Sequence, residues 1–180
     1  ANILNNGFTS GTGGDSQYLL DTDHPTIAAP SGLANEPSTA ADLNETSIEA
    51  GLTAIGNFKD ERGFKIAARG MKLIIPADLQ FTAERLMASN QRTSTADNDI
   101  NAIKSKGMLP QGYVVNNFLT DTDAWFIKTD VPNGLKMFER AAIKTAMEGD
   151  FDTGNMRYKA RERYSFGWSD WRGIYGSPGA

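Results

Sequence analysis

The stretch GMKLIIPADLQFTAERLMAS, residues 70–89, carries a strand pattern followed at once by a helix pattern. Residues 71–75 form a short apolar run rich in branched side chains, which predicts a buried strand. Pro76 lacks the amide hydrogen that a strand ladder needs, so the strand is expected to end there. Beyond it the apolar residues recur with the period of a helix, and they are Leu79, Ala83, Leu86 and Met87. A strand that feeds a helix indicates an α/β or α+β fold, without indicating a function.

The composition is that of one compact domain with room for a smaller lobe, since 39% of the 180 residues are hydrophobic and 22% are charged. The absence of cysteine excludes disulfide bonds, thiolate zinc sites and cysteine nucleophiles. No apolar run approaches the ~20 residues of a membrane span, and the first residues lack a signal-peptide pattern. We therefore expect a soluble chain with no membrane partner.

Charge is distributed unevenly along the chain, whose net charge is -4. Residues 1–60 hold eight acids and one base, whereas residues 61–180 hold 17 bases and 14 acids. Two parts of opposite sign attract one another, within one molecule or between neighbours. Solvated faces of unequal charge are the simpler alternative. The mildly acidic total argues against a dedicated nucleic-acid binder.

The first forty residues predict mostly loops. Residues 1–6 look like the end of an element that starts upstream, so the chain is expected to be a fragment or a processed product. The Gly-rich residues 7–16 predict a flexible loop. A phosphate cradle is the alternative, but the Gly-Lys-Ser/Thr that it needs does not follow them. Residues 18–20 predict a short strand, and residues 28–42 an extended connector along the surface.

His24 is the only histidine and lies in a predicted turn, residues 21–25. It is either a metal ligand together with Asp21 and Asp23 or a hydrogen-bonded turn residue. The short spacing and the lack of a second histidine favour the hydrogen-bonded interpretation.

The next segment predicts a helix and a second short strand. Thr46 and Glu49 have the spacing of a capping box, which places the start of a helix there. The helix is expected to end near Gly56 and to bury an apolar stripe of Ile48, Leu52 and Ile55. Residues 64–68 predict a short strand that returns into the strand at 71–75.

Residues 90–112 predict a long polar loop with a single helical turn near residues 100–103. Loops of this length in a compact domain are often binding or assembly segments. Two buried strands are predicted after it, at residues 113–115 and 124–128, and we expect them to form a hairpin-like pair.

The C-terminal third contains one undecided segment. Residues 135–147 have helix-forming alanines and charged residues, yet Phe138 and the short interval between turns also allow a strand up to Ala141. The acidic turn at residues 149–154 resembles part of a calcium loop but lacks the later glutamate. The aromatic residues of 168–176 are expected to be buried in the core or under a neighbour.

Residues 156–168 alternate with the period of a strand. One face carries Arg157, Lys159, Arg161 and Arg163, and the other carries mainly Tyr158, Ala160, Tyr164, Phe166 and Trp168. Bases in alternating positions repel one another unless anions face them, which indicates a surface for acidic protein or nucleic acid. A solvated edge strand protected by its charge is the alternative.

No catalytic constellation is recognisable. The sequence has no second histidine, no thiol and no Gly-x-Ser-x-Gly motif, and turn formation explains the Asp121 and Asp123 pair more simply than glycosidase chemistry. We therefore expect no catalytic residue, metal or cofactor, and we look for the function in surfaces.

The order of the segments resembles the major capsid proteins of tailed bacteriophages, whose fold is named after the Hong Kong ninety-seven phage, and more closely the branch with the Mu-like head subunits. The matching pieces are residues 5–8, 18–25, 35–37, 41–43, the Ile48 helix, 73–76 with its helix, 124–126, 150–153 and 161–173. Each piece is weak alone, but their order and spacing extend over nearly the whole chain.

The resemblance implies an α+β fold with an axial domain, in which helices flank a mixed sheet, and part of a peripheral domain. Residues 1–45 would give a peripheral strand and connector, 46–116 the axial core, and 117–180 the remaining axial strands and a return to the peripheral domain. Residues 90–112 would approach a five- or six-fold axis. Family members are longer, so the chain is expected to be the C-terminal portion, without the N-terminal arm, extended loop and most of the spine helix.

The implied function is that of a structural subunit of an icosahedral head, which forms pentamers and hexamers around double-stranded DNA. Implied partners are further copies, portal, scaffold or cement proteins, and DNA contacted non-specifically. The implied location is the virion, assembled in the host bacterial cytoplasm. The alternatives are a soluble α+β ligand- or calcium-binding module and, less favoured, a hydrolase. The candidate interface residues are Asn98, Asp99, Asn101, Lys104, Lys106, Arg157, Lys159, Arg161, Arg163, Trp168, Trp171 and Arg172.

Overall fold

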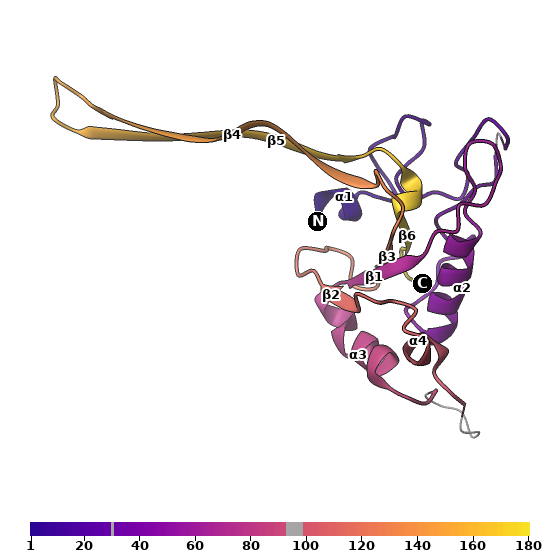
Figure 1. Cartoon of the computed structure of the whole chain (residues 1–180). Helices are drawn as coiled ribbons and strands as arrows, with labels where there is room; N and C mark the ends of the chain where they lie inside the picture. Colours follow the sequence, from indigo (N-terminus) through magenta and orange to yellow (C-terminus); the bar gives the residue numbers. More distant parts are fainter. Residues whose placement is uncertain (30, 93–98) are drawn as a thin grey trace.

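The structure is a computed structural model that describes residues 1–29, 31–92 and 99–180. A four-stranded sheet with the order β2-β1-β3-β6 forms the centre of the body (Figure 1). Its strands are β1 (Gly70–Ile75), β2 (Tyr113–Val115), β3 (Trp125–Thr129) and β6 (Ile174–Ser177). β1 runs parallel to β2 and antiparallel to β3, so the sheet is mixed. The α+β class expected from the sequence is confirmed.

The strand and helix expected in residues 70–89 are both present. β1 ends immediately before Pro76, and a 3-10 turn, η1 (Ala77–Leu79), leads into α3 (Gln80–Ala88). Ala83 and Leu86 are the buried residues of α3, as the apolar stripe predicts. None of the described helices is long and apolar enough to cross a membrane.

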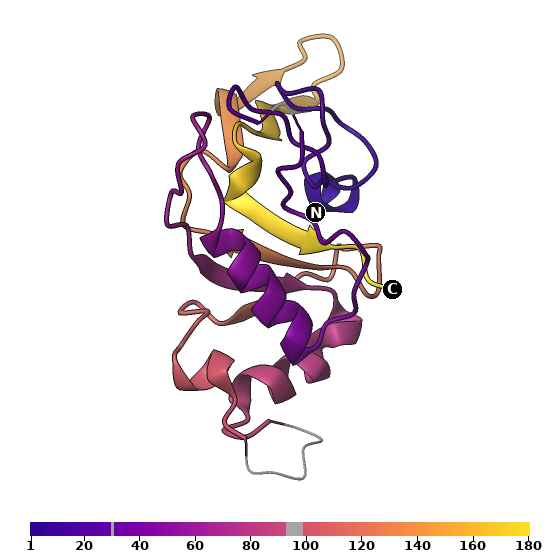
Figure 2. The ribbon, with the colours of Figure 1, turned by 90° about the vertical axis from the view of Figure 1, so that its right-hand side faces the viewer.

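The helix α2 (Glu45–Gly56) lies across one face of the sheet (Figure 2). The expected capping box at Thr46 and Glu49 is wrong, because the cap is Asn44, whose side chain accepts from the amide of Ser47. The Ser47 hydroxyl in turn accepts from the Asn44 amide, which leaves the start of α2 two residues earlier than expected. The apolar stripe is correct, since Ile48 and Ile55 are fully buried.

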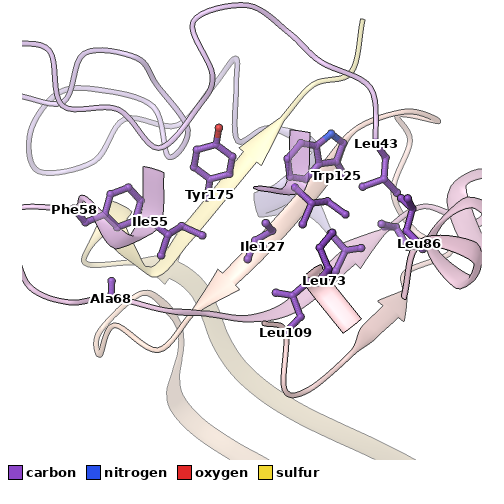
Figure 3. Packing of buried hydrophobic residues seen from close by; sticks show 14 of the residues in the cluster. Leu43, Ile55, Phe58, Ala68, Leu73, Leu86, Leu109, Trp125, Ile127 and Tyr175 are labelled. Atoms are coloured by element: carbon purple, nitrogen blue, oxygen red, sulfur yellow. The ribbon is translucent and has the colours of Figure 1, made fainter. Parts of the chain in front are cut away.

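The sheet is packed on both faces. Trp125 and Ile127 of β3 point into the main core under α2 (Figure 3), together with Leu73 of β1. The alternate residue Phe126 points to a second, smaller core with Leu4, Leu19, Leu20, Ala124 and Ile174. Leu4 comes from α1 (Asn2–Asn5), so the first turn of the chain closes the far side of the sheet.

Three expected strand features are wrong. Residues 18–20 form no strand; the Leu20 amide donates to the Gly7 carbonyl, and both Leu19 and Leu20 are buried by packing rather than by a ladder. Residues 64–68 contribute only an isolated bridge, between Lys59 and Lys65. β2 and β3 are not a hairpin, because β1 lies between them and pairs with both.

The segment that the sequence left open is a strand. β4 (Leu135–Gly149) pairs with β5 (Met156–Trp168) in a separate two-stranded sheet that projects from the body (Figure 1). We call residues 135–168 the arm. At about 3.3 Å per residue, the 15 residues of β4 span roughly 50 Å. The remaining elements, α4 (Ala102–Ser105) and η2 (Trp171–Gly173), lie at the end of α3 and at the base of the arm.

Candidate assembly interface

One face of the arm is apolar and exposed. Residues directly opposite in an antiparallel pair point to the same face, and successive residues of a strand alternate. The register therefore places six large apolar residues of the two strands on one side, which we call the apolar face: Leu135, Met137, Met147, Tyr158, Tyr164 and Phe166. Glu139 shares this side, and Phe138 lies on the other. The exposed fractions of the six apolar residues range from 39% to 64%. Leu135, Met137 and Phe166 line a hollow at the base of the arm together with residues of α1.

The opposite face of the arm is cationic. Lys144 pairs directly with Arg161, while Lys159 and Arg163 occupy the neighbouring same-face positions of β5. We call these four residues the cationic quartet. All four are exposed, and within the described part of the chain none of them forms a salt bridge. The alternation expected for residues 156–168 is thus confirmed, and Lys144 extends it to the second strand.

Arg157 differs from the quartet because it has an anion at the tip of the arm. Its guanidinium lies 2.6 Å from the Asp150 carboxylate, in the turn that joins the strands. Asp150 also accepts from the Asp152 amide, so the turn that resembles a calcium loop uses this carboxylate internally. No group of three or more histidine or acidic side chains in the described ranges is placed to hold a metal ion.

The base of the arm is fixed by Arg172, which is only 6% exposed. Its guanidinium donates to the Lys59 carbonyl at 2.6 Å, to Glu61 at 2.9 Å and to Asp170 at 3.1 Å. It also lies 4.4 Å from the ring centroid of Trp171, within the range of a cation–π contact. Arg172 and the buried Trp171, both candidate interface residues, therefore serve the chain's own core, whereas Trp168 is half-buried.

His24 is completely buried beside this base. Its Nδ1 lies 2.7 Å from the Asp15 carboxylate and its Nε2 lies 3.1 Å from the Asn35 side-chain oxygen. Its ring stacks on Trp171, with centroids 4.4 Å apart. The hydrogen-bonded interpretation of His24 is confirmed, although the partners are not the neighbouring aspartates. No local pattern indicates these partners, because Asp15 and Asn35 come from separate loops.

The polar loop before β2 contributes a mixture of exposed and structural residues. Asp99 and Lys106 are exposed, and Asn98 lies outside the described residues. Asn101 is 2% exposed; its side chain accepts from the Ile103 amide and donates to the Leu86 carbonyl. Lys104 donates to the Ala88 carbonyl. Asn101 and Lys104 thus hold α4 against the end of α3.

At two places in the body, two carboxylates lie close to each other: Glu36 with Asp21, and Asp123 with Asp121. Burial, and then the charge of Asp21, raise the pKa of Glu36 to about 7. The hydrogen bond with Asp121 is the largest cause of the raised pKa of Asp123. The Asp121 carboxylate also accepts from the Asp123 amide, in agreement with a turn rather than a catalytic pair.

Comparison with known proteins gives the class of protein. The model of the phage capsid protein family matches residues 1–177, so the chain belongs to the phage capsid protein family. The chain is also similar to a solved structure described as the virus-like particle from Pyrococcus furiosus, with 12% identity and a TM-score of 0.47. That match covers 79% of this chain and 55% of the other, so this chain spans little more than half of that chain's length. The comparison with curated proteins found no match.

Proposed function

We propose that the chain is a structural subunit of an icosahedral tailed-phage head, in which copies assemble into pentamers and hexamers that enclose double-stranded DNA. The fold would be of the Hong Kong ninety-seven type, in the branch of the Mu-like head subunits. Membership in the phage capsid protein family supports the class of this proposal. The exposed arm is the observation that carries it.

A two-stranded ribbon without a core is at best marginally stable in water. The arm is such a ribbon, and it exposes the apolar face along most of its length. Large exposed apolar patches mark surfaces that other molecules cover. Because the protein is a capsid protein, other copies and other segments of the capsid are the natural cover for this face.

The proposal assigns three regions. Residues 1–45 would form a peripheral strand and connector, and residues 46–116 the axial core, with residues 90–112 near a symmetry axis. Residues 117–180 would supply the remaining axial strands and return to the peripheral domain. The arm would contact neighbouring subunits through residues 135–168. Portal, scaffold or cement proteins and the packaged DNA would be further partners in the virion, which would assemble in the host bacterial cytoplasm.

Sedimentation velocity and electron microscopy of the purified protein, over a range of concentrations and salt, test this function. We expect rings of five or six copies, or closed shells, to form as the concentration rises. A species that stays monomeric under every condition would overturn the proposal. A ligand-dependent rise in melting temperature without assembly would favour a binding module instead.

A further inference from the structure

The cationic quartet needs an anion that the arm does not supply. Lys144 and Arg161 face one another directly, and like charges in this position destabilise a strand pair. On the same face the only acid of the ladder is Glu148, which lies opposite Arg157. The quartet is therefore an unneutralised cationic surface on an extended, exposed ribbon.

The body carries a surface of the opposite sign. Asp21, Asp23 and Glu36 form what we call the acidic patch. The antiparallel bridge between His24 and Leu33 and the hydrogen bond from the Asp21 amide to the Asn35 side-chain oxygen lay residues 21–24 beside residues 33–36. The Asp21 carboxylate accepts from the Asp23 amide at 3.1 Å, and burial, followed by the charge of Asp21, raises the pKa of Glu36 to about 7. No base in the described part of the chain pairs with any of the three. These carboxylates repel one another, so a cation placed among them would be stabilising.

We infer that the cationic quartet of one subunit docks on the acidic patch of a second copy of this chain. The inference rests on the proposed function, because it requires that copies assemble. It adds to that function which two surfaces meet, and that opposite charges pair them.

The arm cannot supply this contact within its own molecule. Arg161 lies seven residues from Trp168 at the base of the arm, which is about 23 Å along the strand. The arm projects away from the body (Figure 1), so the quartet does not fold back over residues 1–40. Nucleic acid is the other polyanion to consider, but the chain has a net charge of -4, whereas nucleic-acid binders usually have a basic excess.

The contact also fixes a type of symmetry. The quartet and the acidic patch are different surfaces, so a contact between them is heterologous, from the head of one copy to the tail of the next. Heterologous contacts generate rings when the rotation closes. Charge pairing of this kind contributes specificity and orientation more than it contributes raw affinity.

Charge reversal on each surface tests the inference. The arm variant carries Arg161→Glu and Arg163→Glu, and the patch variant carries Asp23→Lys and Glu36→Lys. The matched control carries Arg62→Glu and Arg69→Glu, which make the same charge change at exposed positions of the body. Melting temperatures identify any variant that fails to fold, and sedimentation velocity measures assembly.

We expect the arm and patch variants each to need about tenfold more protein than the wild type for assembly, while the control does not. The chain with all four arm and patch reversals should assemble again. An equimolar mixture of arm and patch variants should also assemble, and it should favour even-numbered rings because the two types must alternate.

The inference is overturned if the arm variant assembles like the control, or if neither the mixture nor the four-substitution chain restores assembly. It is also overturned if the arm variant assembles normally but its particles retain less nucleic acid, since the quartet then faces nucleic acid. If the wild type itself never assembles, the proposed function is wrong. This outcome differs from the outcomes above, in which the wild type assembles and only the docking of the quartet on the acidic patch is wrong.

Discussion

Gly173 lies so close to Gly134 that a Cβ atom on Gly173 would come within 2.4 Å of the Gly134 Cα atom. Gly134 immediately precedes β4, and Gly173 ends the turn that follows β5. The two glycines therefore bring the two ends of the arm together at the body. At the base of the arm, the backbones of Gly134 and Gly173 are so close that neither residue has room for a side chain larger than the hydrogen of glycine.

The Gly173→Ala substitution should lower the free energy of unfolding by about 2 kcal/mol, because the new methyl group forces the two backbones apart. Thermal or urea unfolding of the purified protein checks this. Gly56→Ala is the matched control, since a Cβ atom there meets no atom within 4 Å. Equal losses in both variants would contradict the close approach as the cause.

Asn35→Asp should be strongly destabilising, by about 3 kcal/mol. The Asn35 side-chain nitrogen donates to the carbonyls of Leu19, Trp171 and Ile174, and an aspartate would turn an oxygen toward all three. The substitution Asn6→Asp, at an exposed position, is the control for the change of charge. Chemical denaturation at neutral pH measures both variants, and a near-neutral Asn35→Asp would be inconsistent with this hydrogen-bond network.

Glu36 should make the stability depend on pH. Its pKa is raised in the folded chain, from 4.5 to about 7, so the folded state holds the proton more tightly than the unfolded state. The resulting stabilisation is complete below pH 4.5 and is lost as the pH rises through 7. The Glu36→Gln variant should therefore gain about 1 kcal/mol on the wild type by pH 8, after allowance for solvent screening of a half-exposed group.

Melting temperatures of the wild type and Glu36→Gln across this range provide the measurement. The difference between the two proteins should widen steadily as the pH rises from 4.5 to 8. A constant difference would mean that burial and Asp21 do not perturb the Glu36 carboxyl.

Most strands could be predicted from the sequence, because β1, β2 and β3 are short apolar runs and β5 alternates with Glu162 as the exception. Their pairing could not, since nothing local shows that β1 separates β2 from β3. β4 stayed undecided because its alanines and charged residues favour a helix, whereas the register with β5 makes it a strand. Tertiary pairing here overrides local propensity.

The cationic side of β5 was predictable, but Lys144 joins it only through the register of β4. Bulges in β4 shift that register by one residue at two places, which moves Lys144 from a position opposite Lys159 to one opposite Arg161, so its partner could not be counted from the sequence. The burial of Trp171, in the core or under a neighbour, is expected from the sequence. The burial of Arg172 is not, because it depends on hydrogen bonds to separate loops. Distant partners of this kind leave no local signal.

The central claim is that the arm is the element through which copies assemble. Placing two carboxylates on the apolar face, with Met147→Asp and Tyr158→Asp, changes a directly opposed and exposed pair toward the tip of the arm, away from the core. The control is Phe64→Asp with Phe81→Asp, two exposed aromatic residues of the body.

Electron microscopy of the wild type, the arm variant and the control, at matched concentration, is the most direct measurement. We expect rings or shells for the wild type and the control, and only dispersed, folded subunits for the arm variant. Abundant rings or shells of the arm variant, as regular as those of the wild type, would contradict it.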